Sequence, residues 1–134
     1  MKTTLAILAC LFVATAQAST PASLIHDYRS QAAKQSSGFQ PSAQRGATFF
    51  RQRFANSSRM PACTSCHSDK PMNSGSHAVT SKTIKPLAPA ANADRFTDPE
   101  KVEKWFRRNC TEVVGRECSS AEKADFIAFL MEVR

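Results

Sequence analysis

The chain has 134 residues, of which 18 are Lys or Arg and 11 are Asp or Glu, and its formal net charge is +7. Single domains commonly have about 100–200 residues, so the length suits one domain. An apolar content of 42% is too high for a wholly disordered chain, and no uninterrupted apolar run reaches the roughly 18 residues that cross a bilayer. The positive charge favours an anionic partner without identifying one.

The first segment has the form of a secretory signal peptide. A short positive start precedes an almost entirely apolar stretch at residues 5–16, and Ala16-Gln17-Ala18 is a small-x-small cleavage site. We therefore expect residues 1–18 to be removed. The alternatives are an N-terminal membrane or core helix and a lipoprotein signal that ends at Cys10.

Cleavage would leave one domain, residues 19–134, whose first part, residues 19–40, forms an N-terminal helical extension. An exported chain of this kind works in the periplasm, where disulfides form and persist. That compartment argues against nucleic-acid binding despite the basic composition. All but one of the five cysteines remain after cleavage.

Two helices are expected in the first half of the mature chain. Thr20 can cap the first, followed by a proline that is tolerated in a first turn, and the apolar spacing fades at residues 36–38. Ser42 can cap the second, which we expect over about 43–54. Gly46 in this helix is a candidate for a close crossing with the last helix of the chain.

The second half is expected to begin with loop and end with two helices. Residues 55–94 are rich in Ser, Asn and Pro and have no sustained period. Thr97 with Glu100, and Ser119 with Glu122, then form capping boxes that open two amphipathic helices. No strand is convincing, so the expected class is all-α. A loop of about 40 residues is uncommon in a compact domain unless something organises it, and a cofactor would do so.

The sequence Cys63-Thr64-Ser65-Cys66-His67 has the spacing of covalent haem c attachment. Two thiols three positions apart can each form a thioether to one haem, and the adjacent histidine becomes the proximal iron ligand. Zinc would need four Cys or His ligands, and only His77 or the distant Cys110 and Cys118 could complete such a set. A thioredoxin-like motif would need a βαβ context, which the pattern lacks. The motif therefore predicts one covalently bound haem c.

Two cysteines remain once the haem is attached. Cys110 and Cys118 are the two cysteines that remain, and in an oxidising compartment such a pair suggests one disulfide. Closing so short a loop would stabilise the fold by about 2–3 kcal/mol. Two free thiols are the alternative.

The second face of the haem has no evident ligand in the sequence. An electron-transfer cytochrome c commonly supplies Met or His there, yet residues 82–124 contain neither. The remaining candidates all lie outside the expected place: His26, Met60, Met72, His77 and Met131.

The stretch from Ile84 to Leu130 carries a resemblance to a known family. The residues that carry it are Pro86-Leu87-Ala88-Pro89, Asp94-Arg95-Phe96-Thr97-Asp98, Val102-Glu103-Lys104-Trp105, and Asn109-Cys110 with Gly115-Arg116-Glu117-Cys118. In these motifs the chain resembles the sphaeroides haem protein family, small monohaem class I cytochromes c with high-spin iron. With the haem motif and the helix around Arg45-Gly46, the resemblance covers nearly all of the mature chain.

The resemblance implies roles for single residues. In that family an asparagine just before the first disulfide cysteine ligates ferric iron, and the matching residue is Asn109. The ligand leaves on reduction, after which the open site can bind oxygen or nitric oxide. The resemblance also implies a class I cytochrome c fold, a Cys110–Cys118 disulfide, and a dihaem cytochrome c and a membrane cytochrome b as electron partners. Without it, Asn109 would be read as the C-cap of its helix.

Four further residues are expected near the haem. Pro86 resembles the class I proline whose carbonyl accepts a hydrogen bond from the proximal imidazole, an ordinary loop proline being the alternative. Lys85 and Arg95 are candidates to neutralise the haem propionates, with a solvated surface as the alternative. Trp105 is expected to pack against the haem or in the core.

The basic residues of one helix bear on the partner. Lys101, Lys104, Arg107 and Arg108 indicate either a solvated face or a docking surface for an acidic redox partner. The sequence predicts a monomeric periplasmic cytochrome c that transfers electrons and binds a small diatomic ligand when reduced, rather than an enzyme. A plain six-coordinate electron shuttle and a small-molecule oxidoreductase that uses the open haem site are the alternatives.

Overall fold

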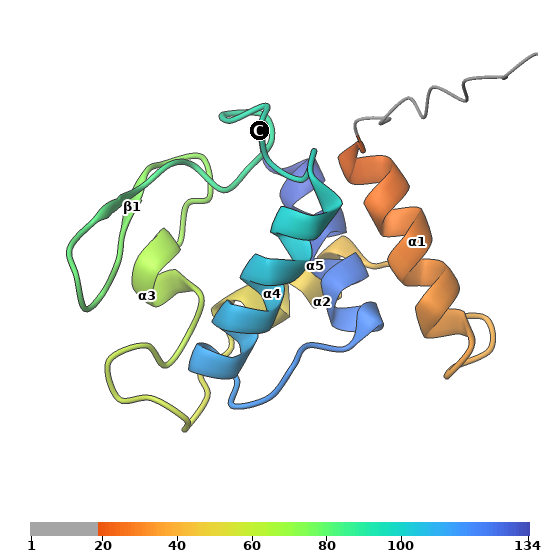
Figure 1. Cartoon of the computed structure of the whole chain (residues 1–134), viewed down its shortest axis with the longest axis horizontal. Helices are drawn as coiled ribbons and strands as arrows, with labels where there is room; N and C mark the ends of the chain where they lie inside the picture. The colour runs from red at the N-terminus through yellow and green to blue at the C-terminus, as the bar shows by residue number, and fades with distance from the viewer. Residues whose placement is uncertain (1–18) are drawn as a thin grey trace, which may run out of the picture.

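A computed structural model describes residues 19–134, so the expected signal peptide and Cys10 lie outside the described residues. The class is mostly helical, which confirms the all-α prediction. In chain order the elements are α1 (Pro21–Ala33), α2 (Ala43–Arg51), α3 (Thr64–His67), β1 (Gly75–Ser76), β2 (Thr83–Ile84), α4 (Pro99–Val113) and α5 (Ser120–Glu132). Figure 1 shows α1 on one side of the molecule, and α3 with β1 on the other, with α4 between them.

Helices α1, α2 and α5 begin where the sequence predicts. The Thr20 side chain caps α1 by accepting a hydrogen bond from Ser23 N. Ser119 and Glu122 form a capping box at the start of α5. α2 also starts as expected after Ser42, but it ends at Arg51 because the next residue turns to an extended conformation.

The expected cap of α4 was wrong. Asp98 is the N-cap and its side chain accepts a hydrogen bond from Lys101 N, whereas the Thr97 hydroxyl donates to Asp94 O. The next residue, Pro99, explains the shift, because a residue before proline is disfavoured in the helical region. Asp98 is therefore held extended, at φ −124° and ψ 105°, as an N-cap residue must be.

The segment between α2 and α4 is not wholly loop. It contains the one-turn helix α3 and an antiparallel pairing of β1 with β2, in which Gly75 faces Ile84. The prediction of no strand was wrong here, since strands of two residues carry no alternating pattern to detect. A Cβ added at Gly75 would overlap the backbone carbonyl of Cys66, so the hairpin lies directly against the Cys66–His67 backbone.

The core forms where α2 and α5 cross. A Cβ added at Gly46 would overlap the carbonyl oxygen of Asp125 and lie 2.9 Å from Cβ of Phe129, which confirms the close crossing. Phe50 and Ile127 are fully buried beside it. Within residues 19–134, no helix has both the length and the apolar character needed to cross a membrane.

A polar cluster ties α1 to the two last helices. The Tyr28 hydroxyl donates to Glu103 at 2.5 Å, and Lys123 Nζ donates to the same carboxylate at 2.8 Å. The Lys123 ammonium also lies 5.4 Å from the centroid of the Tyr28 ring. These contacts join α1, α4 and α5, and they position the helix that carries Asn109.

Candidate haem site

The two cysteines of the haem motif lie in and next to the single helical turn α3. Cys63 is the N-cap of α3 and makes no capping bond through its side chain, and Cys66 lies within the turn. Both thiols are free and half-buried. Burial raises the pKa of Cys63 to about 11, and Cys66 Sγ accepts a hydrogen bond from Ala78 N at 3.3 Å. Both thiols are thus available for thioether bonds.

His67 ends α3 as a neutral imidazole. The next residue, Ser68, takes φ 56° and turns the chain out of the helix. Burial, followed by the positive charge of Arg95, lowers the pKa of His67 to about 4. The imidazole is therefore unprotonated near neutral pH, which is the form that ligates a metal.

The loop after β2 is folded around Arg95. Its Nε donates to Pro86 O at 2.9 Å, and its terminal NH2 donates to Lys85 O at 2.6 Å. Asn92 Nδ2 also donates to Pro86 O, at 3.3 Å. We expected the Pro86 carbonyl to accept a hydrogen bond from the His67 imidazole. In the structure it already accepts two other hydrogen bonds, from Arg95 and Asn92. The Arg95 contacts had no sequence signal, since they span a loop without periodicity.

Lys85 and Arg95, the residues expected to neutralise the haem propionates, differ in their exposure to solvent. The Lys85 side chain is exposed, whereas Arg95 is half-buried. The Arg95 guanidinium is occupied by the two backbone carbonyls named above. Its observed role in this structure is therefore to close the loop.

Asn109 lies inside α4. The helix continues to Val113 and is capped by Val114, so the C-cap interpretation of Asn109 was wrong. The residue is half-buried, and its side-chain amide makes no hydrogen bond within residues 19–134. The side-chain amide has both a carbonyl oxygen and an NH2 group with which it can bind a further ligand or a metal.

Trp105 lies one helical turn before Asn109 on the same side of α4. The core placement expected as one possibility was wrong, because Trp105 is 43% exposed while its neighbour Phe106 is buried. The guanidinium of Arg108 lies 5.6 Å from the centroid of the indole. A large aromatic side chain left uncovered beside Asn109 is suited to pack on a planar apolar group.

The alternative iron ligands differ in their exposure and in their contacts. The His26 side chain is 73% exposed on α1, and Met131 is exposed on α5. The Nδ1 atom of His77 already accepts hydrogen bonds from Val79 N and Thr80 N. Met60 and Met72 are half-buried in the loops on either side of the haem motif.

A disulfide joins Cys110, near the end of α4, to Cys118, just before α5, with their Cα atoms 5.6 Å apart. Both residues are buried. Because Cys110 directly follows Asn109, the disulfide anchors the backbone next to that side chain.

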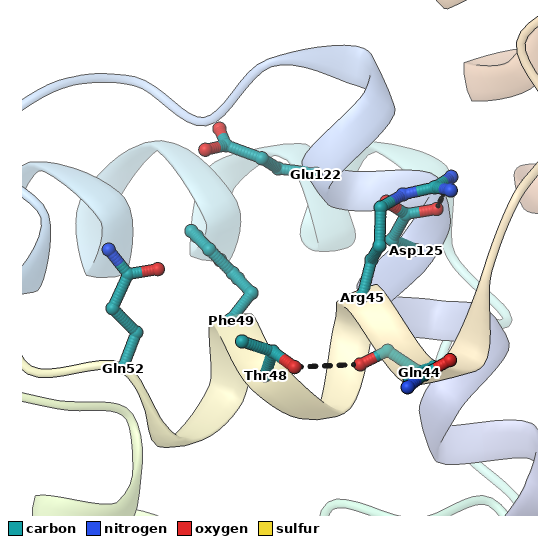
Figure 2. Close-up of a pocket in the computed structure, with 7 residues that line it drawn as sticks. All are labelled: Gln44, Arg45, Thr48, Phe49, Gln52, Glu122 and Asp125. Carbon is teal, nitrogen blue, oxygen red and sulfur yellow. Dashed lines mark hydrogen bonds and ion pairs between the residues drawn. The ribbon is translucent and has the colours of Figure 1, made fainter.

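A separate surface pocket of about 380 Å³ lies between α2 and α5 (Figure 2). Its polar lining is engaged within the protein: Arg45 is paired with Asp125 at 2.7 Å, and Thr48 donates to Gln44 O. None of its lining residues belongs to the haem motif or the loop after it. We assign no ligand to it.

The donor set fits a haem better than a zinc ion. No three His, Cys, Asp or Glu side chains in the described part of the chain lie close enough together to hold a metal ion. The small antiparallel sheet also lacks the βαβ context of a thioredoxin. Free Cys63 and Cys66 and a neutral His67 are instead the groups that attach and ligate a covalently bound haem.

Comparison with known proteins agrees. A family model described as "Domain of unknown function (DUF1924)" matches residues 36–130. Cytochrome c'' of Methylophilus methylotrophus is 40% identical over 98% of this chain and 94% of its own length. The cytochrome c-type protein SHP of Cereibacter sphaeroides is 43% identical over 83% of this chain and 82% of its own.

Solved structures of these two relatives share the fold. Oxidized SHP, described as an oxygen binding cytochrome c, gives a TM-score of 0.77 at 41% identity and covers 84% of this chain and 96% of its own. The solution structure of the Methylophilus methylotrophus protein, reported with the structural basis of its haem-ligand detachment, gives 0.75 at 40% identity, covering 85% and 94%. The chain is therefore a haem c protein with the cytochrome c fold, and it belongs to the DUF1924 family together with SHP and cytochrome c''.

Proposed function

We propose that this protein is an exported, monomeric electron-transfer cytochrome c whose distal ligand, Asn109, leaves on reduction. The open site would then admit a small diatomic molecule such as oxygen or nitric oxide. The observation that carries the proposal is the position of Asn109, a half-buried residue in mid-helix whose side chain has no hydrogen-bond partner among the described residues.

The chemistry of the amide explains why the ligand would be labile. A bound haem supplies an iron that alternates between ferric and ferrous states. The side-chain carbonyl oxygen of Asn109 is a hard, neutral donor, which the more positive ferric ion holds better than the ferrous ion. After release, the side chain keeps an NH2 donor that can hydrogen-bond an incoming diatomic molecule.

The surroundings limit how far Asn109 moves. The disulfide at Cys110 anchors the following residue to the start of α5, and α4 is held at Glu103 by Tyr28 and Lys123. We therefore expect release to involve a rotation of the Asn109 side chain rather than a shift of α4. The relatives support the proposal, since SHP is described as oxygen binding and cytochrome c'' is reported with haem-ligand detachment.

Asn109→Ala tests the ligation. We expect an altered ferric optical spectrum and at least tenfold tighter binding of imidazole to the ferric protein, because no internal ligand has to be displaced. Asn73→Ala is the matched control, since Asn73 is exposed in a turn. A ferric spectrum of Asn109→Ala that matches wild type would reject Asn109 as the ligand.

The electron donor is proposed to be an acidic cytochrome, of the dihaem c or membrane b type. The basic side chains on α4 are exposed, although Arg107 lies 3.8 Å from Glu117 and Arg108 pairs with Glu112 at 3.1 Å. Lys101 and Lys104 form no ion pair within residues 19–134. Replacing these two lysines by glutamine should slow reduction by an acidic donor at low salt, and 0.5 M salt should erase the difference.

Export to the periplasm is proposed from residues 1–18. N-terminal sequencing of the protein recovered from a periplasmic fraction should read Ser19 first. A retained Met1 or a lipid-modified Cys10 would contradict cleavage after Ala18.

A further inference from the structure

Arg95 is an unusual charge in the loop that follows the haem motif. It is half-buried, and its guanidinium bonds only neutral backbone carbonyls, those of Pro86 and Lys85. No carboxylate of residues 19–134 forms an ion pair with it. A partly desolvated cation without a counter-charge exerts a stronger field on its neighbours than a solvated or paired one.

The contacts of this loop place that field on the His67 side of the site. Leu87 N and Ala88 N both donate to Pro71 O, at 2.9 and 3.0 Å, which holds the loop against the chain just after His67. Arg95 is bonded to the same loop through the Pro86 carbonyl, so its charge is fixed beside the segment that begins with His67. Because its hydrogen bonds fix the guanidinium, the charge cannot swing away into solvent.

We propose that Arg95 is a positioning residue that raises the reduction potential of the haem on His67, through its fixed charge and its hold on the Pro86 carbonyl. This inference rests on the haem site and on the proposed release of Asn109 on reduction. It assigns Arg95 a regulatory effect, because the reduction potential decides how reducing a donor must be before the distal site opens.

Two physical effects act in the same direction. A positive charge near the iron favours the ferrous state, which carries one positive charge less than the ferric state. The Pro86 carbonyl, which already accepts from Arg95, would also be a weaker acceptor for the His67 imidazole of the holoprotein, and that ligand would then be less basic. A less basic proximal ligand stabilises ferric iron less. Both effects are lost when the guanidinium is removed.

The test is a potentiometric titration of the holoprotein. We expect Arg95→Gln to shift the ferric/ferrous equilibrium at least tenfold toward ferric, which is about 59 mV for a one-electron couple. Arg29→Gln is the matched control, because it removes one positive charge from the exposed face of α1. Arg95→Lys keeps the positive charge but loses the planar guanidinium that donates to two carbonyls, and it should retain most of the wild-type reduction potential.

Ionic strength separates a built-in charge from a surface one. The Arg95→Gln shift should persist at 0.5 M salt, since partly buried charges are screened little, whereas any shift of Arg29→Gln should vanish. The proposal is overturned if Arg95→Gln and Arg29→Gln have the same reduction potential, or if the potential shift of Arg95→Gln disappears at high salt. It is also overturned if Arg95→Lys lowers the reduction potential as much as Arg95→Gln does. Carbon monoxide binding to reduced wild type reports separately on the release of Asn109, so failure of the two ideas can be told apart.

Discussion

Asp125 is a buried carboxylate that joins α5 to the start of α2. It is 6% exposed, and its carboxylate accepts hydrogen bonds from Ser42 N at 2.7 Å and from Arg45 Nε at 2.7 Å. The same side chain thus caps the start of α2 and pairs with a residue in its first turn. Figure 2 shows Arg45 and Asp125 side by side among the residues that line the pocket.

Asp125→Ala should lower the free energy of unfolding by about 2 kcal/mol. The loss combines a broken ion pair with an unsatisfied backbone donor, and it stays below the roughly 3–5 kcal/mol of fully buried pairs because Arg45 can return to water. Urea denaturation of the holoprotein measures it. The control Asp69→Ala, at an exposed position, should change stability by less than about 0.5 kcal/mol. Equal effects of the two variants would contradict the assigned role.

At the scale of elements, the crossing of α2 and α5 depends on a missing side chain. Gly46→Ala should destabilise the protein by about 2–3 kcal/mol, because the new Cβ would overlap Asp125 O and force the helices apart. Gly38→Ala is the matched control: it has no neighbour within 4 Å, but its φ of 79° disfavours alanine, at a cost of about 1 kcal/mol. If Gly46→Ala costs no more than Gly38→Ala in thermal unfolding, close packing is not what the glycine provides.

The link between α4 and α5 is the second element that can be tested. Replacing Cys110 and Cys118 together by alanine should cost about 2–3 kcal/mol, since the disulfide restricts the unfolded chain. Opening the bond in the wild-type protein with a phosphine reductant is the control, because it leaves the side chains in place. Both treatments should shift the urea midpoint in the same direction. No shift in either would mean that the bond does not stabilise the fold.

At the scale of the whole molecule, carboxylates in ion pairs set the response to acid. Burial works to raise the pKa of Glu103, but hydrogen bonds from Lys123 and Tyr28 outweigh it and hold the pKa below its ordinary value of 4.5. A carboxylate whose pKa is lower in the folded state contributes stability above its unfolded pKa and loses it as pH falls through the folded pKa.

The stability difference between wild type and Glu103→Gln should therefore be largest near neutral pH and shrink below about pH 4.5. Taking the difference between the two proteins removes the common effect of acid on His67. Thermal unfolding at several pH values between 7 and 3 measures it. A difference that stays constant over this range would show that the Glu103 charge does not contribute.

The sequence predicts those features that depend on residues close together in the chain. Capping residues located the starts of α1, α2 and α5, and the Cys63–His67 spacing predicted the haem. The start of α4 lies one residue later than predicted because Pro99 holds Asp98 in an extended conformation. One-turn α3 and the two short strands have no periodicity to detect.

The sequence does not predict contacts between segments that are far apart in the chain. The cluster of Tyr28, Glu103 and Lys123 joins residues far apart in the sequence, and the Arg95 contacts lie inside an irregular loop. For Asn109 the family resemblance named the residue, and the structure placed it in mid-helix. What the sequence lacks in such cases is the packing that brings the segments together.

The release of Asn109 on reduction is tested most directly by carbon monoxide. Optical spectra of the purified protein would be recorded in the ferric state, after dithionite reduction, and during rapid mixing of the reduced protein with carbon monoxide. We expect a ferric spectrum that depends on Asn109, and a reduced protein that binds carbon monoxide at once. A low-spin ferrous spectrum that carbon monoxide leaves unchanged would show a stable sixth ligand, and the protein would then be a plain electron shuttle.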